Sequence, residues 1–542
     1  MVLSIFEREN RIVGKQEKWI VFGLMVAIIA AHLINLGLMP LLADEAIRAT
    51  VAFEMMQHKN PIVPTLWGDF YYRKPPLYNW IIIGFFSLFN SYSEFVLRLP
   101  SVLPLFAFAG VIWYVSRKHI VDKAGVLAGL AFVLSGRLLT RDSMLGHIDI
   151  FFSLVTFIGF FVIYYYHKKQ KWWQLFMISY LLAAAGVLMK GLPSFLFQGL
   201  TLGVWFIYQK DWKRLLSIQH VSGIVLFAAI VGGYFFAYSQ YNSLEAYFSE
   251  LYGQAAMRTV VDKKWYEGVL NFFTFPFENI GHLLPTSLLV VFAIKKGIIK
   301  SWMKDDFTAF VLLTLGVNVI PYWLSPGYYP RYLFMLYPLF YILIADAYYK
   351  NRVELVKREK IMFWVFLVAG VVITIAPVGA LFVEELIDLW YTIPAVILCV
   401  VLGAAVLWLW VKLPDQRIYW SLAFVVLFRL GFDFFVLPYR VYVEDNLSVH
   451  KKEMSLAVAE KSGDHAVALF DQSPVYLEYA FYVGVAKGEI IQRTIEMRPN
   501  TMYLVDEGRL SRLGEHEVYF QFPMRYKTYQ MNLVKFKPTA DE

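Results

Sequence analysis

The composition of this 542-residue chain is that of a membrane protein. Hydrophobic residues make up 58% of it, aromatic residues 18% and charged residues only 17%, and the mean hydropathy is +0.52. Soluble domains place charge at about a quarter of their positions, whereas here apolar runs of membrane-spanning length recur from Trp19 almost to Pro438. These features exclude a soluble enzyme, a fibrous protein and a disordered chain.

Net charge and cysteine content narrow the classes of partner and cofactor. The net charge of +8 comes from 50 Lys and Arg against 42 Asp and Glu, but no soluble part of the chain carries a basic stripe, so we expect no nucleic-acid partner. The single cysteine, Cys399, lies inside an apolar run, which excludes a disulfide framework and a multi-cysteine metal site. We expect neither a metal nor another cofactor.

The apolar runs predict thirteen membrane-spanning helices, each near the ~20 residues that a bilayer core requires. A further run, from Trp80 to Phe89, is too short to cross and predicts a re-entrant or interfacial helix. The expected fold class is therefore an all-α polytopic membrane protein. The predicted spans cover residues 19–39, 99–116, 122–140, 149–166, 172–189, 192–208, 219–241, 281–294, 307–324, 330–348, 360–382, 392–411 and 418–436.

The distribution of Lys and Arg over the loops supports this topology. Basic clusters fall in alternate loops, which the positive-inside rule assigns to the cytoplasm. Counting Trp80 to Phe89 as a full span would reverse every later loop, so the thirteen-span topology is favoured. The clusters lie within residues 8–18, 117–123, 168–171, 210–214, 295–304, 350–360 and 412–417.

The C-terminal part of the chain differs in composition from the rest. From Tyr439 onward, short apolar runs alternate with helical stretches, which predicts a small α/β domain. The first span has no cleavage site behind it, so the N-terminus is expected inside, and the odd total of thirteen spans then places this domain outside the cytoplasm. We thus predict a transmembrane domain over residues 1–438, with interfacial helices in the outer loop 40–98, and an extracytoplasmic domain over 439–542. Its predicted strands are His465–Phe470, Thr501–Val505 and Val518–Phe522.

The first outer loop opens with a polar helix. Asp44 and Arg48 are four residues apart, so they share one helix face and can pair or face a common ligand. Asp44 is equally compatible with a simple N-cap. Ile47, Val51 and Met55 form an apolar stripe at helical spacing, which predicts a helix lying along the membrane surface.

A basic turn follows in the same loop. Arg73 and Lys74 directly precede Pro75 and Pro76, and aromatic residues flank the turn on both sides. Because the prolines fix the backbone, the two cations are preset to bind a lipid phosphate. The alternative is that both side chains only snorkel to the headgroup region.

Later outer loops add further charges. Asp149 lies where the fourth span enters the bilayer, a position that is costly for a carboxylate unless it is paired. Lys190, Arg258 and Arg331 are expected on the outer side of the membrane, where the positive-inside rule predicts few basic residues. They are either structural ion pairs or, if they converge, the wall of an anion-binding pocket. His147 more often represents an interfacial polar group than a ligand.

These motifs, taken in chain order, resemble those of the GT-C glycosyltransferases that use polyprenyl-phosphate sugars. The resemblance covers the first ten spans well and the last hundred residues only loosely, and it is greatest to the lipid A aminoarabinose transferases and the protein O-mannosyltransferases. The motifs are Asp44-Glu45, Arg73-Lys74-Pro75-Pro76-Leu77, Asp149, Lys190-Gly191 and Pro330-Arg331-Tyr332 through Leu336-Tyr337-Pro338.

The resemblance implies a reaction at the outer face of a bacterial inner membrane. A sugar carried on a polyprenyl phosphate such as undecaprenyl phosphate would pass, with inversion and by direct displacement, to lipid A, another glycolipid or a protein. Arg73 departs from the aminoarabinose transferases, which usually have a glutamate there. In this interpretation the catalytic candidates are Asp44 and Asp149, and the substrate-binding candidates are Lys74, Arg73, Arg48, Glu45, Arg258, Tyr332 and Lys190.

The residue types suit this chemistry, since negative charge grows on the leaving phosphate and basic side chains can stabilise it. A carboxylate near the anomeric carbon can stabilise positive charge or accept the acceptor's proton. Two alternatives remain. A lipid flippase would have ionisable residues in mid-span; here the carboxylates cluster at the outer ends of helices, with Arg429, Asp433 and Asp346 as exceptions. A non-catalytic surface assembly protein would use the C-terminal domain for binding.

Overall fold

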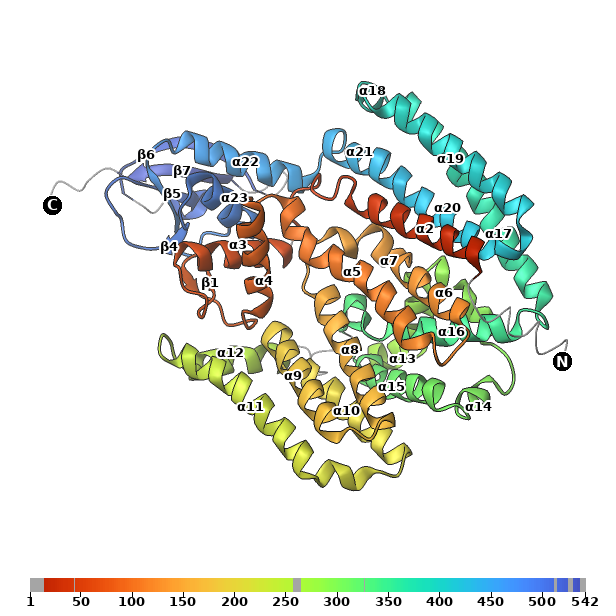
Figure 1. Ribbon diagram of the computed structural model, residues 1–542. Helices are drawn as coiled ribbons and strands as arrows, with labels where there is room; N and C mark the ends of the chain where they lie inside the picture. Colours follow the sequence, from red (N-terminus) through yellow and green to blue (C-terminus); the bar gives the residue numbers. More distant parts are fainter. Residues whose placement is uncertain are drawn as a thin grey trace.

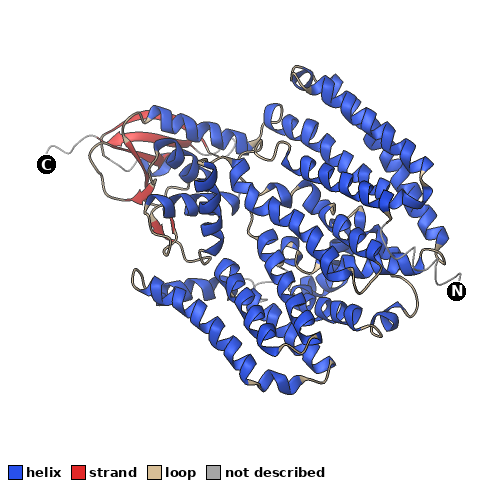
Figure 2. Cartoon of the chain, in the orientation of Figure 1, coloured by secondary structure: helices blue, strands red, loops and turns tan. Residues whose placement is uncertain are grey.

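The computed structural model describes residues 14–42, 44–256, 265–325, 327–510, 514–524 and 530–536. A large helical body carries a small β-sheet at one end (Figure 2). The sheet is formed by the C-terminal part of the chain (Figure 1). This arrangement confirms the predicted fold class, an all-α membrane protein with a small α/β region at its C-terminal end.

Nine helical segments in the described parts of the chain are long and apolar enough to cross a membrane. The chain is therefore a multi-pass membrane protein. The segments are α2 (Lys15–Leu33), α5 (Glu94–Ser116), α8 (Asp149–Lys168), α9 (Trp172–Lys190), α11 (Ile218–Ser239), α15 (Asp306–Trp323), α17 with η6 (Val356–Ile375 and Ala376–Phe382), α19 (Thr392–Lys412), and η7, α20, η8 and α21 in succession (Pro414–Gln416, Arg417–Gly431, Phe432–Val436 and Leu437–Tyr442).

The predicted count of thirteen spans is not confirmed. A tenth span is obtained if α6 (Asp122–Val133) and the following α7 (Gly136–Thr140) count as one, although the chain bends by 49° between them. Two other predicted spans form shorter helices, α10 (Pro193–Tyr208) and α16 (Tyr337–Asn351). The short connecting elements are η1 (Asp142–Met144), η2 (Trp212–Leu216), α12 (Leu244–Ala256), α14 (Ile298–Trp302), η5 (Pro330–Leu333) and α18 (Glu384–Ile387).

The span predicted over residues 281–294 is wrong in its bounds. Helix α13 (Trp265–His282) ends just inside the predicted segment, and the 3₁₀ helix η4 (Thr286–Phe292) follows it. Pro285 precedes η4 and has no N–H to continue an α-helical ladder. The apolar composition of this segment was recognised correctly, but the helix that leads into it begins in what was expected to be an outer loop.

The first outer loop forms a compact unit of two helices and a hairpin. It contains α3 (Asp44–Gln57), the strands β1 (Thr65–Leu66) and β2 (Asp69–Phe70), and the short α4 (Leu77–Phe89). The 13 residues of α4 are too few to cross a bilayer, as expected. The stripe on α3 does not lie on the membrane surface, because Val51 and Met55 are buried against Tyr71 and other side chains of the protein.

The C-terminal region is a five-stranded sheet with helices. Strand β3 is parallel to β4 and β5, while β7 is antiparallel to both β5 and β6, giving the order β4-β3-β5-β7-β6. Three strands match the prediction closely, and β4 and β7 were missed. The elements are α22 (Leu447–Lys461), β3 (Ala466–Phe470), α23 (Leu477–Lys487), β4 (Gln492–Thr494), β5 (Thr501–Asp506), α24 (Glu507–Leu510), β6 (His516–Pro523) and β7 (Gln530–Phe536).

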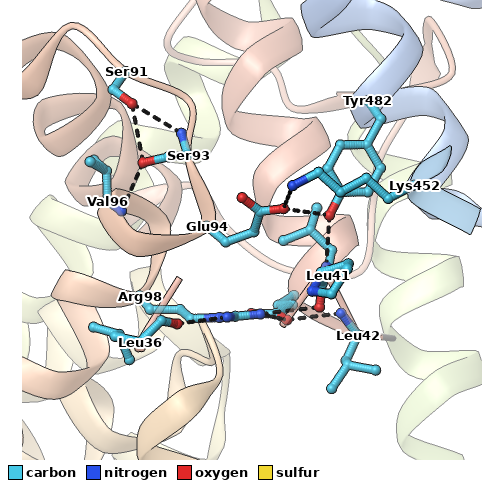
Figure 3. Close-up of polar contacts among 12 residues, drawn as sticks. Leu36, Leu41, Leu42, Ser91, Ser93, Glu94, Val96, Arg98, Lys452 and Tyr482 are labelled. Atoms are coloured by element: carbon cyan, nitrogen blue, oxygen red, sulfur yellow. Dashed lines mark hydrogen bonds and ion pairs between the residues drawn. The ribbon is translucent and has the colours of Figure 1, made fainter. Parts of the chain in front are cut away.

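This C-terminal region packs directly on the first outer loop. In Figure 1, α23 lies beside α3 although more than four hundred residues separate them in sequence. Figure 3 shows Glu94 at the base of the contact, where it accepts hydrogen bonds from Lys452 Nζ at 2.6 Å and from the Tyr482 hydroxyl at 2.8 Å. The Tyr482 hydroxyl in turn accepts the Leu41 N–H.

Trp67 makes the second contact between the two regions. It lies in the two-residue turn between β1 and β2, where Trp67 and Gly68 both have positive φ, as in the tight turns that suit the twist of a hairpin. Its side chain is buried within the hydrophobic core of the C-terminal region, and its carbonyl accepts the Arg493 N–H. The side chain and the carbonyl of Trp67 thus both hold the hairpin against the C-terminal region.

Candidate active site

Most of the charged residues singled out in the sequence meet around one cavity of about 320 Å³. Its walls come from the start of α3, the loop before α4, the start of α8, the end of α9, helix α12 and the η5 segment. Chain segments far apart in sequence therefore contribute to a single site. The lining residues are Asp44, Ile47, Arg48, Tyr71, Arg73, Lys74, His147, Ile148, Asp149, Lys190, Glu250, Arg331 and Tyr332.

The two aspartates share one arginine. Asp44 begins α3, and its carboxylate pairs with the Arg331 guanidinium at 2.5 Å. Asp149 begins α8 and lies 2.6 Å from Lys190 Nζ and 3.6 Å from Arg331 Nε. The two carboxylates differ in exposure, with 56% of the Asp44 side chain accessible against 6% for Asp149. Asp44 is therefore the carboxylate available to a ligand, and Asp149 mainly holds the two cations in place.

Lys190 is positioned by the end of α9. Gly191 ends the helix at φ +93°, a conformation that residues with a side chain rarely adopt. The Lys190 ammonium lies 4.4 Å from the ring centre of Tyr332 and 4.9 Å from that of Phe152. Contacts with the two aromatic rings and with the Asp149 carboxylate offset the cost of burying this cation.

The basic turn reaches the same cavity. Pro76 is the N-cap of α4, so the two prolines place Arg73 and Lys74 just before a helix start. Lys74 Nζ donates to the Lys190 carbonyl at 3.4 Å. Arg73 lies nearer the solvent, 4.0 Å from Glu250 of α12. The turn therefore presents its cations to the cavity and not only to the lipid headgroups.

Arg48 is the most enclosed cation of the cavity. It does not pair with Asp44, as the spacing had allowed, but donates to the Tyr71 hydroxyl and lies over the Tyr71 ring at 5.1 Å. Only 7% of the residue is exposed. Its Nη1 atom is buried without a hydrogen-bond partner, a state that is costly unless a ligand supplies an acceptor.

Glu45 does not line the cavity. It follows Asp44 directly, and consecutive residues on a helix point about 100° apart. Its fully buried carboxylate pairs with Arg98 at 2.8 Å and accepts the backbone N–H groups of Leu42 and Gly146, both at 2.8 Å. Glu45 thus ties the start of α3 to the second outer loop, and we assign it a structural role in place of the expected substrate contact.

Two lining residues were ranked too low or missed in the sequence. Arg331 was named as a possible wall of an anion-binding pocket and as part of a motif but not as a site residue, and Glu250 was not singled out because nothing in α12 marks it. Arg258 lies outside the described residues. His147 does line the cavity; burial lowers the pKa of its imidazole, so it is neutral at pH 7, and neither ring nitrogen has a hydrogen-bond partner.

The donor set gives little support for a metal site. Within the described ranges, no three His, Cys, Asp or Glu side chains are grouped so that they could hold a metal ion. At the two aspartates, the Arg331 guanidinium already occupies the position between the carboxylates. A cation there opposes a second cation by direct repulsion.

Comparison with known proteins agrees with this architecture. Residues 73–234 match the family model described as dolichyl-phosphate-mannose-protein mannosyltransferase. The crystal structure of ArnT from Cupriavidus metallidurans bound to undecaprenyl phosphate superimposes with a TM-score of 0.66 at 16% identity, covering 96% of this chain and 99% of that one. The apo form of the same ArnT gives a TM-score of 0.67 at 14% identity, covering 97% and 100%.

The chain has the GT-C fold. The resemblance to ArnT and to the protein mannosyltransferases, first indicated by the motifs, is thereby confirmed. No curated protein sequence gives a significant match. The matched family segment begins at Arg73, so it includes the basic turn as well as Asp149 and Lys190.

Proposed function

We propose that this protein is a membrane glycosyltransferase that takes a sugar from a polyprenyl-phosphate carrier. The observation that carries the proposal is the convergence of Asp44, Lys74, Lys190 and Arg331 on one cavity. ArnT, which shares the fold over nearly the whole chain, has been crystallised with undecaprenyl phosphate. The proposed donor is therefore a sugar on undecaprenyl or a similar polyprenyl phosphate, and the proposed acceptor is a hydroxyl of lipid A or another envelope glycolipid.

In the proposed reaction, the acceptor oxygen attacks the anomeric carbon while the bond from that carbon to the phosphate oxygen breaks. The electron pair of the broken bond leaves with the phosphate, which changes from a monoanionic diester to a dianionic monoester. Lys74, Arg73, Arg48 and Arg331 stabilise the added negative charge. The proton of the acceptor hydroxyl passes to Asp44, the exposed carboxylate.

Donor binding also changes the partners of Asp44 in this scheme. Asp44 pairs with Arg331, and a phosphate entering the cavity competes for that guanidinium, since Arg binds phosphate as readily as carboxylate. Asp44 would then be released toward the acceptor when the donor is in place. Lys190 would keep Asp149 neutralised throughout.

Purified protein with a radiolabelled polyprenyl-phosphate sugar and an envelope lipid extract tests the proposal. Appearance of label in an acceptor supports it. Two outcomes contradict it: movement of the labelled lipid between leaflets of a vesicle without transfer, which a flippase would give, and binding without either activity, which a non-catalytic assembly protein would give.

Protein acceptors are the second candidate, favoured by the matched mannosyltransferase family segment. The same labelled donor distinguishes them, because label would then appear in protein and not in lipid.

The buried pair Arg429–Asp433, at 2.7 Å, is the feature that a flippase would use. However, Arg429 also donates to the carbonyl of Leu139 in α7, so this pair braces the helix from which the chain leads to the cavity.

A further inference from the structure

The cavity has an excess of positive charge. Five of its lining side chains are Lys or Arg, three are Asp or Glu, and His147 is neutral because burial lowers its pKa. Two positive charges are thus left over whichever ion pairs form. The monoanionic phosphodiester of a polyprenyl-phosphate sugar would neutralise only one of them before the reaction.

Each of the three described carboxylates that line the cavity already faces a cation. Asp44 pairs with Arg331 at 2.5 Å, Asp149 pairs with Lys190 at 2.6 Å, and Glu250 faces Arg73 at 4.0 Å. A positively charged group on the sugar would have to displace one of these cations. It would also lie within a few ångströms of the others, where repulsion at an effective dielectric constant of about 20 is substantial.

Arg48 contributes to this positive charge and also has an unmet hydrogen bond. It is 7% exposed, lines the cavity, and its Nη1 atom lacks a hydrogen-bond acceptor. A hydroxyl or carboxylate oxygen of the ligand can satisfy this donor, whereas an ammonium cannot because it has no lone pair.

We infer that the sugar carried into this cavity bears no positive charge: it is a neutral or acidic sugar, and not one with a free amino group. This inference rests on the proposed function and narrows its substrate class. Arg73 is consistent with this inference, since it adds a cation at the mouth of the cavity and faces the carboxylate of Glu250.

Competition binding tests the inference without knowledge of the acceptor. The probe is radiolabelled undecaprenyl phosphate on the purified full-length protein, displaced by three undecaprenyl-phosphate hexoses that differ at one position: a hydroxyl, a free amine or an N-formyl amine. At pH 7 we expect the hydroxyl and formyl donors to compete similarly and the free amine to need at least about tenfold more. This gap, the ratio of the concentrations needed for displacement, should close above the pKa of the amine.

Variants of Arg48 test whether the charge of this residue causes the difference in binding between the donors. Arg48→Gln should narrow the gap between the amine and formyl donors about threefold, while Arg48→Lys, which keeps the charge, should preserve it. Arg498→Gln removes an exposed arginine from the C-terminal region and serves as a matched control with the full gap. The melting temperature of each variant confirms that it is folded.

The outcomes separate this inference from the proposed function. Equal or tighter binding of the free-amine donor at pH 7 overturns the inference, even if sugar transfer is later demonstrated. Failure of all three sugar donors to displace the probe overturns both, because the cavity then does not accept a polyprenyl-phosphate sugar.

Discussion

Arg331 is the residue on which the two acidic candidates depend. It contacts both Asp44 and Asp149, and it comes from a segment nearly two hundred residues further along the chain than Asp149. The carboxylates were recognised from the sequence, and Arg331 was named as a possible pocket residue, but its position between them was not predicted because spacing along the chain does not report this contact. Substitutions of single residues therefore test the role of each charge.

Lys74→Ala is expected to weaken donor binding and nearly abolish transfer. Its ammonium is held in the cavity by the proline turn, and charge-assisted contacts with phosphate contribute about 1.5 to 3 kcal/mol each. Lys74→Arg should restore only part of the activity, because the guanidinium has a different shape. The measurement is donor affinity and initial rate for folded protein. Near-normal activity of Lys74→Ala would refute the phosphate assignment.

Asp44→Asn should lower turnover by about 10² or more while donor binding is largely retained, as is usual for loss of a positioned base or charge stabiliser. Asp149→Asn should instead affect binding and stability, since it leaves the buried Lys190 without its carboxylate partner. Rates and donor affinities of the two variants distinguish the roles. Equal losses in both quantities for both variants would contradict them.

Transfer is also predicted to be metal-independent, since cationic side chains can neutralise a single lipid phosphate. Initial rates with EDTA and with added Mg²⁺, Mn²⁺ or Zn²⁺ check this prediction. Loss of activity in EDTA that one of these ions restores would make Asp44 and Asp149 candidate ligands, with Arg331 displaced.

At the scale of elements, the hairpin β1–β2 connects the site to the C-terminal region. Trp67 is buried in the C-terminal core, and the chain then runs directly to Arg73 and Lys74. Trp67→Ala should therefore destabilise the protein by about 3 to 5 kcal/mol and weaken donor binding. Phe70→Ala in the same hairpin is the control, because Phe70 is 47% exposed and should change little. A normal melting temperature and affinity for Trp67→Ala would show that the hairpin does not need this anchor.

Glu54 predicts a pH dependence of the same element. Its buried carboxylate accepts the N–H groups of Trp67 at 2.8 Å and Gly68 at 3.2 Å, and burial raises its pKa to about 7. The folded state therefore binds this proton more tightly than the unfolded state, so the contribution to stability is greatest below about pH 4.5 and is lost as pH rises to about 7. Complete loss of this contribution, above about pH 7, lowers the free energy of unfolding by at most about 3 kcal/mol.

Thermal unfolding in detergent at pH 6 and pH 8 measures this effect. The melting temperature should be lower at pH 8, and Glu54→Gln should reduce the difference because glutamine does not titrate. A melting temperature that rises between pH 6 and pH 8 in the parent, and not in Glu54→Gln, would reverse the assigned sign.

At the scale of the whole molecule, the C-terminal region is predicted to lie outside the cytoplasm. Single cysteines introduced there in a Cys399→Ala background should react with an impermeant maleimide in intact spheroplasts. Exposed positions such as Ile495 and Met497 are suitable, at 72% and 51% accessible. Labelling only after permeabilisation would overturn the topology, and the cavity would then face the cytoplasm.

The parts of the fold that could be predicted are those set by local composition. Apolar length identified most of the spanning helices, and the motifs around Asp44, Lys74, Asp149 and Lys190 identified most of the cavity. The bounds of α13 were not predictable in this way, because its polar start resembles a loop. Glu250, the burial of Glu45 and the packing of α3 depend on contacts between distant segments, which composition does not report.

The burial of Trp67 also constrains the order in which the protein can be completed. The hairpin is made early, but the core that encloses its indole is built from residues 454–533. Until that last part has been synthesised and folded, the turn with two positive φ values lacks its covering and the segment leading to Lys74 has no fixed support. Because domains generally fold as units in the order of synthesis, the hairpin is covered only after the helices that line the cavity have been made. Removal of residues 454–533 would therefore uncover the Trp67 indole and take away the support of the segment that leads to Lys74.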